Sequence, residues 1–380
     1  MREVAVIGAG MTSFGRFPEK SLFDLAREAI VDALRDAGVD IRDIQAFWAG
    51  SQYHTLQVGQ TMLQEVGMAG IPVVNVANAC ATGSTAVREA YYAVASGQYD
   101  LTLACGAEQM GKMGLLGVGE GGGGGVSPEG ILGTFLMPGI FAELGVRHMK
   151  EYGTKPEHFA KVAVKNHKYS VYNPRSQYQK AFTLEEVMNA RMICWPNTLY
   201  MCCPTGDGAA AVVLCSMEKA RQYTTKPVRV AASVLKTPPY TSQSLGFVDI
   251  APMTRGAAEQ AYESAGLGPK DLDVIELHDC FATAELLHYE NLHLCEWGEG
   301  GRMIDEGRTE LGGDIPINMS GGLLSKGHPI GATGAAQIAE LVWQLRGDAQ
   351  TRERQVPDAK VGLGHVQGGF DVCTVHILTV

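Results

Sequence analysis

Two stretches of the chain, AREAIVDALRDAGVDIRDIQAFWAG at 26–50 and TRGAAEQAYESAGLGPKDLDVIELH at 254–278, repeat one pattern, and this repeat decides the fold. Each reads as a helix that closes at a glycine and continues through a polar turn into an apolar strand. Gly38 in the first stretch is matched by Gly266 in the second, and Asp43 is matched by Asp271 at the same offset. The repeat predicts two halves of the same architecture.

A second correspondence extends the repeat on its C-terminal side. CATGSTAVREAYYAVASG at 80–97 and GATGAAQIAELVWQLRG at 331–347 both read as an ATG turn followed by a helix, and an apolar strand follows each of them. The strand–helix alternation predicts an α/β chain whose strands are buried and largely parallel. Unrelated strand–helix units also resemble one another, so chance similarity stays open as an alternative at this point.

The length of 380 residues suits two or three domains. The repeat predicts an N-terminal half over 1–110 and 200–245 and a C-terminal half over 246–380. Residues 111–199 fit neither half and are rich in glycine, methionine, proline and aromatic residues, so we expect an inserted loop domain there.

Composition excludes several classes of protein. The chain is 46% hydrophobic and carries a formal net charge of −10 without a Lys/Arg-rich run, which argues against nucleic-acid binding. It lacks an apolar run long enough to span a membrane, and its N-terminal stretch reads as a strand rather than a secretory signal. The 9 cysteines form no CxxC pair, so we expect reduced thiols, a cytoplasmic location and no metal site.

The glycines of VIGAGMTSFG at 6–15 do not form a dinucleotide-binding motif. After Gly8 and Gly10 the third glycine of GxGxxG would be residue 13, which is Ser13. We therefore expect no nucleotide cofactor.

A cysteine between a strand and a helix is the first candidate for chemistry. Cys80 in NACATGSTA (78–86) has small neighbours and stands just before a predicted helix. The positive end of the helix dipole is expected to lower the pKa of its thiol. A buried packing cysteine is the alternative.

A histidine lies beside the repeat counterpart of Cys80. His328 in SGGLLSKGHPIGATGAAQ (320–337) precedes Gly331, which matches Cys80 in the repeat. If the two halves are related by a pseudo-two-fold axis, both helix N-termini point to one centre. His328 would then lie close enough to Cys80 to form a Cys–His pair.

Two further segments point to the same centre. His278 and Cys280 in ELHDCF (276–281) follow a strand, where open α/β sheets bind ligands, and they suit acid/base chemistry. His278 capping the next helix, with Cys280 as a packing residue, is the alternative. The glycines of GLGHVQGGF (362–370) allow backbone N–H groups to approach an oxyanion.

Taken together, these motifs resemble the thiolases, and among them the sterol-carrier-protein type. The resemblance rests on NACATGSTA (78–86), HFAKVAVKNHKYSV (158–171), CCPTGDGAAA (202–211), ELHDCF (276–281) and SGGLLSKGHPIGATG (320–334), and it spans nearly the whole chain. It implies a five-layered αβαβα thiolase fold with duplicated halves and an inserted loop domain. It also implies an acyltransferase of lipid metabolism and β-oxidation that uses CoA and acyl-CoA as substrates.

The resemblance also implies roles for individual residues. Cys80 is similar to the acylated nucleophile, His328 to the group that activates it, and Cys280 to the acid/base that removes an α-proton. His278 matches the position that holds an oxyanion-hole water. The backbone N–H groups of Cys80 and Gly368 would hold the thioester oxygen.

Alternative functions remain in view. A retro-aldolase of a sterol-type side chain and a ketoacyl synthase belong to the same superfamily, and a non-catalytic lipid-binding protein is a rival from another class. The resemblance implies a homodimer, and some relatives pair with a small zinc-ribbon/OB-fold protein. We expect Met113 and Met137 of the inserted segment to contact the acyl group, because flexible methionines suit an irregular apolar ligand.

Overall fold

The computed structural model describes residues 1–54, 56–67, 70–111, 137–224, 226–239 and 249–380. Within these residues nine strands form one sheet in the order β3-β2-β4-β7-β1-β8-β11-β10-β9. The strands are β1 (Val4–Met11), β2 (Ala46–Gly50), β3 (Val73–Val76), β4 (Leu101–Gln109), β7 (Asp207–Ser216), β8 (Val228–Lys236), β9 (Val274–Glu276), β10 (Val361–Gly368) and β11 (Val372–Thr379).

The sheet consists of two parts joined at one narrow seam. Strands β1 and β8 share only two residue pairs, Ala5 with Arg229 and Val6 with Val228. On one side of this seam the strand directions from β1 through β7, β4 and β2 are antiparallel, antiparallel and parallel. On the other side the steps from β8 through β11, β10 and β9 follow the same sequence of directions. The duplication inferred from the sequence is therefore present in the topology.

The expectation of largely parallel strands is wrong. Within the described nine-stranded sheet, five strand pairings are antiparallel and three, β2–β3, β2–β4 and β9–β10, are parallel. A strand buried on both faces is apolar throughout whichever way its neighbours run, so the sequence pattern does not report direction.

The predicted helices match the repeat in detail. Helix α1 (Leu22–Ala37) and helix α9 (Ala251–Ala265) end at Gly38 and Gly266, whose φ angles are 65° and 68°. Both glycines adopt the left-handed conformation that closes a helix, and glycine does so without a steric penalty. Helix α3 (Thr82–Ala95) and helix α13 (Ile330–Arg346) form the second matched pair.

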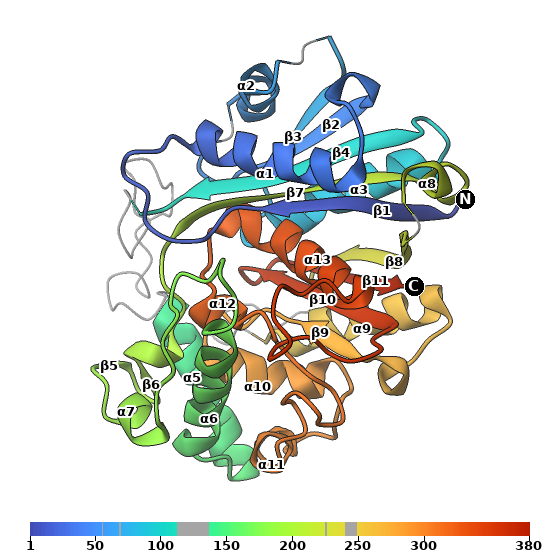
Figure 1. Ribbon diagram of the computed structural model, residues 1–380. Coiled ribbons are helices and arrows are strands. Elements are labelled where there is room, and N and C mark those ends of the chain that lie inside the picture. Colours follow the sequence, from blue (N-terminus) through green and yellow to red (C-terminus); the bar gives the residue numbers. More distant parts are fainter. Residues whose placement is uncertain (55, 68–69, 112–136, 225, 240–248) are drawn as a thin grey trace.

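These helices and sheets stack in five layers, as the predicted αβαβα fold requires (Figure 1). Helix α1 covers the outer face of the first sheet part, α3 and α13 lie side by side between the two parts, and α9 covers the other outer face. Three apolar cores fill the spaces between the layers, and both sheet parts contribute to the middle one. The other helices of four or more residues in the described part of the chain are α2 (Val58–Glu65), α5 (Met137–Tyr152), α6 (Pro156–Ser170), α7 (Leu184–Met188), α8 (Met217–Tyr223), α10 (Ala282–Asn291), α11 (Gly300–Asp305) and α12 (Gly322–Ser325).

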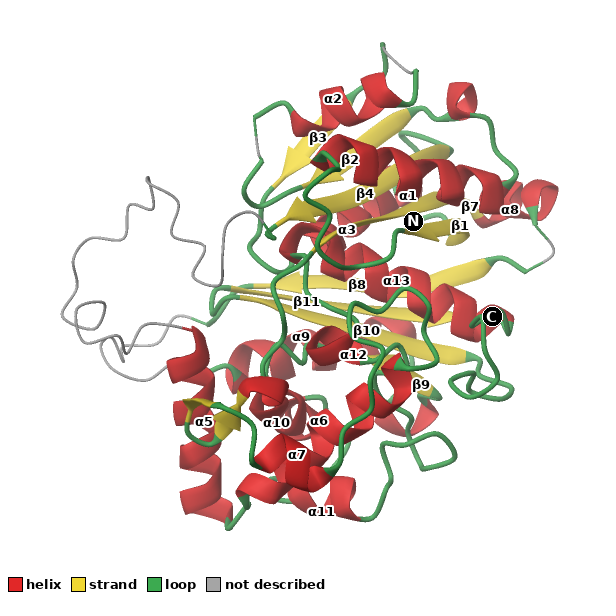
Figure 2. Cartoon of the chain, turned by 60° about the vertical axis from the view of Figure 1, so that its left-hand side comes forward, coloured by secondary structure: helices red, strands yellow, loops and turns green. Residues whose placement is uncertain are grey.

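The inserted segment belongs to the first half by its position in the sequence, but it packs against the second half. It follows β4 and precedes β7, both in the first half. Its helices α5 and α6 nevertheless contact α10, α11 and α12 of the second half, and they share an apolar cluster with them (Figure 2). A two-stranded hairpin, β5 (Met192–Cys194) and β6 (Asn197–Thr198), completes the described part of the insert.

Strand β8 precedes residue 245, the predicted boundary between the two halves. It lies before that boundary, yet it pairs with β11 along most of its length and takes the place in the second half that β1 takes in the first. No helix in the described part of the chain is long and apolar enough to cross a membrane.

Small residues hold the two central helices together at their N-terminal ends. A Cβ atom on Gly334 would lie 2.3 Å from the backbone nitrogen of Ser84, and one on Gly83 would lie 2.6 Å from the carbonyl oxygen of Gly331. These distances are shorter than any van der Waals contact, so only glycine fits. The N-termini of α3 and α13 therefore meet at the centre of the molecule.

We predict that Gly334→Ala destabilises the fold by about 1–3 kcal/mol, the usual cost of overpacking, because α3 and α13 must separate to admit the methyl group. Urea unfolding measures this change. Gly256→Ala in α9 is the matched control, since its Cβ would meet nothing nearer than Lys236 Nζ at 3.5 Å. An unchanged midpoint for Gly334→Ala would show that the two helices have room to move.

Candidate active site

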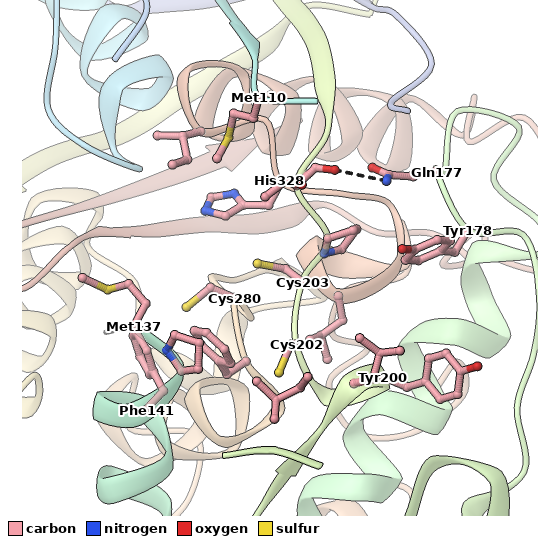
Figure 3. A pocket seen from close by; sticks show the side chains of 18 of the residues that line it. Met110, Met137, Phe141, Gln177, Tyr178, Tyr200, Cys202, Cys203, Cys280 and His328 are labelled. Carbon is pink, nitrogen blue, oxygen red and sulfur yellow. Dashed lines mark hydrogen bonds between the residues drawn. The ribbon is translucent and has the colours of Figure 1, made fainter. Parts of the chain in front are cut away.

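A cavity of about 750 Å³ opens at this helix junction, and it brings the sequence candidates together. Cys80, His278, Cys280 and His328 all line it (Figure 3). The ligand atoms of Cys80, His278 and His328 lie within 4.8 Å of one another. Three segments far apart in the sequence thus converge on one small space.

Cys80 is held by the turn that precedes α3. Ala79 has a φ of 49°, an uncommon left-handed conformation for a residue with a side chain. Its backbone N–H donates to Oε1 of Gln52 at 2.8 Å. The turn places Cys80 two residues before Thr82, the first residue of α3, and leaves the thiol partly exposed to the cavity.

His328 lies just before α13 and is oriented by a residue of that helix. Its Nδ1 lies 2.7 Å from Oγ1 of Thr333, and the Thr333 hydroxyl donates to the carbonyl oxygen of Pro329 at 3.0 Å. Because the hydroxyl proton is used on Pro329, His328 is the donor to Thr333 and carries its proton on Nδ1. Its Nε2 is then an acceptor, as a general base requires. Thr333 was not singled out in the sequence.

The HDCF segment is tied to the segment that leads to His328. Asp279 accepts hydrogen bonds from the backbone N–H groups of Leu323 at 2.7 Å and Leu324 at 3.2 Å, and from Asn166 Nδ2 at 2.7 Å. Next to it, the carbonyl oxygen of Cys280 accepts from the N–H of Cys203 at 3.0 Å. These bonds fix Cys280 relative to the neighbouring loops.

The cavity contains more thiols than the sequence analysis singled out. Cys202 and Cys203 line it together with Cys80 and Cys280, and Figure 3 shows the sulfur atoms of Cys203 and Cys280 pointing into the same space. Vicinal cysteines before a strand read as a turn, so their sequence gave no sign of this position. Only the fold reveals that the loop before β7 lines the cavity.

Burial decides the protonation state of the reacting groups. It raises the pKa of the Cys80 thiol to about 11, although backbone N–H groups of Gly369 and Cys80 act in the opposite direction. Burial also raises the pKa of Cys280 well above its usual value and lowers the pKa of His328 to about 3. At neutral pH the site therefore holds two thiols and a neutral imidazole. The expected lowering of the Cys80 pKa by the helix dipole is wrong, because desolvation of the thiolate outweighs it.

The role of Gly368 as an oxyanion-hole donor stays a prediction, and the structure offers its neighbour Gly369 as a second candidate. Gly368 is the last residue of β10, and a Cβ on it would lie 2.6 Å from the carbonyl oxygen of Asn78, so it packs against the turn before Cys80. Gly369 lines the cavity instead, and its backbone N–H points at the Cys80 thiol. The N–H group of Gly369 is therefore a candidate donor beside that of Cys80.

The two methionines named from the sequence have different outcomes. Met137, the first residue of α5, lines the cavity and is 42% exposed. Met113 lies outside the described residues. Near Met137, the rings of Phe141 and Phe281 stack with their centroids 5.0 Å apart. These three residues form an apolar side of the cavity, here called the apolar wing.

The opposite wing is aromatic and basic. Phe182 and Tyr200 of the insert stack at 4.0 Å, and His167 meets the edge of Phe182 at 4.9 Å. The exposed side chains of Arg16, Lys180 and Arg191 also line the cavity. Apart from His167, which lies in the 158–171 motif, these residues carry no motif, so only the fold identifies them.

One thiol and two imidazoles are also a donor set that soft divalent cations accept, and Cys80, His278 and His328 are close enough to form such a group. The expectation that this site works without a metal stays a prediction.

We predict that the rate of Cys80 alkylation by iodoacetamide rises about tenfold per pH unit from pH 7 to 9, because only the thiolate reacts and its pKa lies above this range. Mass spectrometry of the labelled peptide follows the reaction, and Cys80→Ser shows the background at other cysteines. A rate that is already constant below pH 7 would mean that a thiolate is the resting state.

We predict that Thr333→Val slows acylation of Cys80 by about 10–100-fold, part of what a positioned general base contributes. Valine keeps the shape of threonine but leaves Nδ1 of His328 without its partner. Thr333→Ser retains the hydroxyl and is the matched control, with a rate close to that of the unmodified protein. Equal rates for the two variants in a single-turnover assay would exclude a role for the hydroxyl.

Comparisons with known proteins agree with this geometry. The model of the thiolase N-terminal domain matches residues 4–187, and that of the thiolase C-terminal domain-like family matches residues 245–379. Sterol carrier protein 2 of Rattus norvegicus is 43% identical over 393 residues, which cover 98% of this chain and 71% of that protein. An acetyl-CoA acetyltransferase of Methanothermobacter thermautotrophicus (strain ATCC 29096 / DSM 1053 / JCM 10044 / NBRC 100330 / Delta H) is 40% identical and is covered, like this chain, over its whole length.

A solved structure described as an Ltp2-ChsH2(DUF35) aldolase superposes with a TM-score of 0.86 at 27% identity, covering 99% of this chain and 98% of that one. The family models span both halves of the fold, and both relatives match nearly the whole of this chain. With the cysteines and histidines of its motifs gathered in one cavity, the chain belongs to the thiolase family.

Proposed function

We propose that this protein is a thiolase that cleaves a 3-ketoacyl-CoA with CoA, or runs the reverse Claisen condensation, through an acyl-enzyme on Cys80. The observation that carries this proposal is the convergence of Cys80, His278 and His328 within 4.8 Å, in a cavity that Cys280 also lines. A nucleophile, a base and an independent second thiol are the groups that the reaction needs.

Acylation starts from the neutral pair. Nε2 of His328 takes the Cys80 proton as Sγ attacks the keto carbon of the substrate. The oxygen of that carbon becomes negatively charged and accepts hydrogen bonds from the backbone N–H groups of Cys80 and Gly369. The carbon–carbon bond then breaks, leaving an acyl group on Sγ and the enolate of acetyl-CoA.

The second thiol completes the proton balance. Cys280 gives its proton to the enolate carbon and forms acetyl-CoA. The Cys280 thiolate then takes the proton of the incoming CoA thiol, which attacks the acyl group on Cys80. The leaving Cys80 thiolate recovers its proton from the His328 imidazolium, so every group ends in its starting state.

The two wings of the cavity suit the two parts of the substrate. Arg16, Lys180 and Arg191 are positioned to meet the phosphates of CoA, since guanidinium and ammonium groups bind phosphate strongly. The apolar wing of Met137, Phe141 and Phe281 is positioned to receive the acyl group. The stacked aromatic rings of this wing favour an acyl group larger than acetyl.

A structural neighbour supports a second candidate reaction. The Ltp2-ChsH2(DUF35) structure is described as an aldolase, so retro-aldol cleavage of an acyl-CoA side chain is the alternative. Retro-aldol cleavage needs no acyl-enzyme, so it would proceed in Cys80→Ser, whereas thiolysis would not.

Assembly is part of the proposal. Strand β3 is the edge of the sheet, Val74 on it is 45% exposed, and the turn of Cys80 follows it directly. We propose a homodimer that pairs through this edge, because an exposed apolar edge strand is a ready pairing surface. A small zinc-ribbon/OB-fold partner remains a proposal that the DUF35-containing neighbour supports. The nine free cysteines fit a reducing, cytoplasmic setting.

We predict that a 3-ketoacyl-CoA or acetyl-CoA acylates Cys80, and that Cys280→Ser is still acylated by acetyl-CoA but loses thiolysis by about 10²–10⁴-fold, the size of a general acid–base contribution. Mass spectrometry locates the adduct, and release of acetyl-CoA from short, branched and aromatic 3-ketoacyl-CoAs measures thiolysis. Cys295→Ser, at a thiol outside the cavity, is the matched control. An adduct on another residue, or full activity in Cys80→Ser, would overturn the proposed function.

A further inference from the structure

The turn that carries Cys80 contains one residue in an unfavourable backbone conformation. Ala79 has a φ of 49°, in the left-handed region that residues with a side chain rarely adopt. Asparagine and aspartate can stabilise this conformation with their own side chains, whereas alanine cannot. Such a residue keeps its conformation only where the surrounding structure holds it. The contacts of Ala79 therefore identify what keeps Cys80 in place.

The carbonyl side of Ala79 is held from within the turn. Its carbonyl oxygen accepts hydrogen bonds from the hydroxyl of Thr82 at 2.6 Å and from the backbone N–H of Thr82 at 3.1 Å. The same hydroxyl accepts a hydrogen bond from the backbone N–H of Asn78 at 2.7 Å. These bonds are local, and they leave the N–H of Ala79 to another partner.

That partner comes from a different loop. Strands β2 and β3 are parallel neighbours, with Gly50 paired to Val76, so the loops that follow them leave the sheet side by side. Gln52 lies in the first of these loops, and its Oε1 accepts the backbone N–H of Ala79 in the second at 2.8 Å. This bond ties the turn of Cys80 to a position 27 residues earlier in the sequence.

Gln52 is itself held by a buried carboxylate. Glu108, near the end of β4, is 0% exposed. Its Oε2 accepts the backbone N–H of Gln52 at 2.7 Å, and its Oε1 accepts the hydroxyl of Ser51 at 3.0 Å. Hydrogen bonds to a buried carboxylate are strong. Glu108 therefore fixes the backbone of Gln52, and with it the point from which the side chain reaches Ala79.

We propose that Gln52 is a positioning residue for the nucleophile: its side-chain carbonyl, anchored through Glu108, holds Ala79 in the left-handed conformation and thereby fixes Cys80. Gln52 acts through Ala79 and does not itself line the cavity. Because Cys80 follows Ala79 directly, a change in the φ of Ala79 moves both the thiol and the backbone N–H of Cys80. The effect on catalysis rests on the proposed function, whereas the hold of Gln52 on the turn does not.

Gln52→Leu tests this role, because leucine removes the acceptor and keeps a side chain of similar size. We expect the maximal single-turnover rate of Cys80 acylation by acetyl-CoA to fall about 10–100-fold, as when reacting groups are displaced by about 1 Å. The acetyl-CoA concentration that gives half of this rate is expected to stay the same, since Gln52 does not line the cavity. A variant that is only less stable would lose reaction amplitude instead of rate. An unchanged rate overturns the proposal.

Ala79→Gly separates the proposed role from a general defect. Glycine adopts a positive φ without a steric penalty, so a turn with glycine at this position does not need the support of Gln52. We therefore expect Gln52→Leu to slow acylation much less in an Ala79→Gly background than in the unaltered protein. The double-mutant cycle measures this difference. An equal slowing in the two backgrounds overturns the proposal, because Gln52 would then not act through the conformation of Ala79.

Gln45→Leu is the matched control. Gln45 directly precedes β2, and its Oε1 accepts the backbone N–H of Asp100 at 2.6 Å. This is the same kind of bond as that of Gln52, at the opposite end of the same strand. Its loss is expected to leave the acylation rate unchanged. An equal slowing in Gln45→Leu and Gln52→Leu would mean that such bonds matter for the fold alone, which overturns the proposal.

A crystal structure of Gln52→Leu tests the hold on the turn without any assay of activity. Ala79 is expected to move to a negative φ and to displace Cys80. A turn that keeps its φ near 49° without Gln52 overturns the inference even if the protein is a thiolase. If the turn moves as expected but neither acetyl-CoA nor a 3-ketoacyl-CoA acylates Cys80 of the unaltered protein, only the proposed function fails.

Discussion

The contact between the N-termini of α3 and α13 is the constraint on which the rest of the molecule depends. Gly83, Gly331 and Gly334 let two backbones approach to distances that no side chain permits. Cys80 precedes one of these helices and His328 precedes the other, so this approach sets the distance between them. The sheets on either side and the outer helices bury apolar surface around this junction and hold it closed.

The internal repeat predicts the fold from the sequence, but features that the repeat does not encode could not be predicted. Matching glycines at 38 and 266 gave the halves, and the matched ATG turns placed Cys80 and His328 at one centre. Strand direction was missed, because a strand covered on both faces is apolar whichever way it runs. The association of the insert with the second half was missed as well, since no local pattern encodes which surface a helix will meet.

The same limit applies within the site. Cys80, His278, Cys280 and His328 lie in recognisable motifs, but the residues that orient them do not. Thr333 reads as one more small residue of a helix, and Gln52 as one more polar residue of a loop, until the fold shows what they contact. The protonation of Cys80 was missed for a different reason. A helix dipole is visible in a sequence, whereas the depth of burial that outweighs it is not.

The path of the insert bears on how such a protein could arise and be taken apart. Two copies of one ancestral unit, joined end to end, would at first be separable into two self-sufficient pieces. Here the insert is encoded between β4 and β7 of the first copy, yet its helices rest on α10, α11 and α12 of the second. If the two halves were produced as separate chains, the apolar surface of the insert would be exposed on the first, and the surface of α10, α11 and α12 that it covers would be exposed on the second. Each half therefore depends on the other to cover its apolar surface.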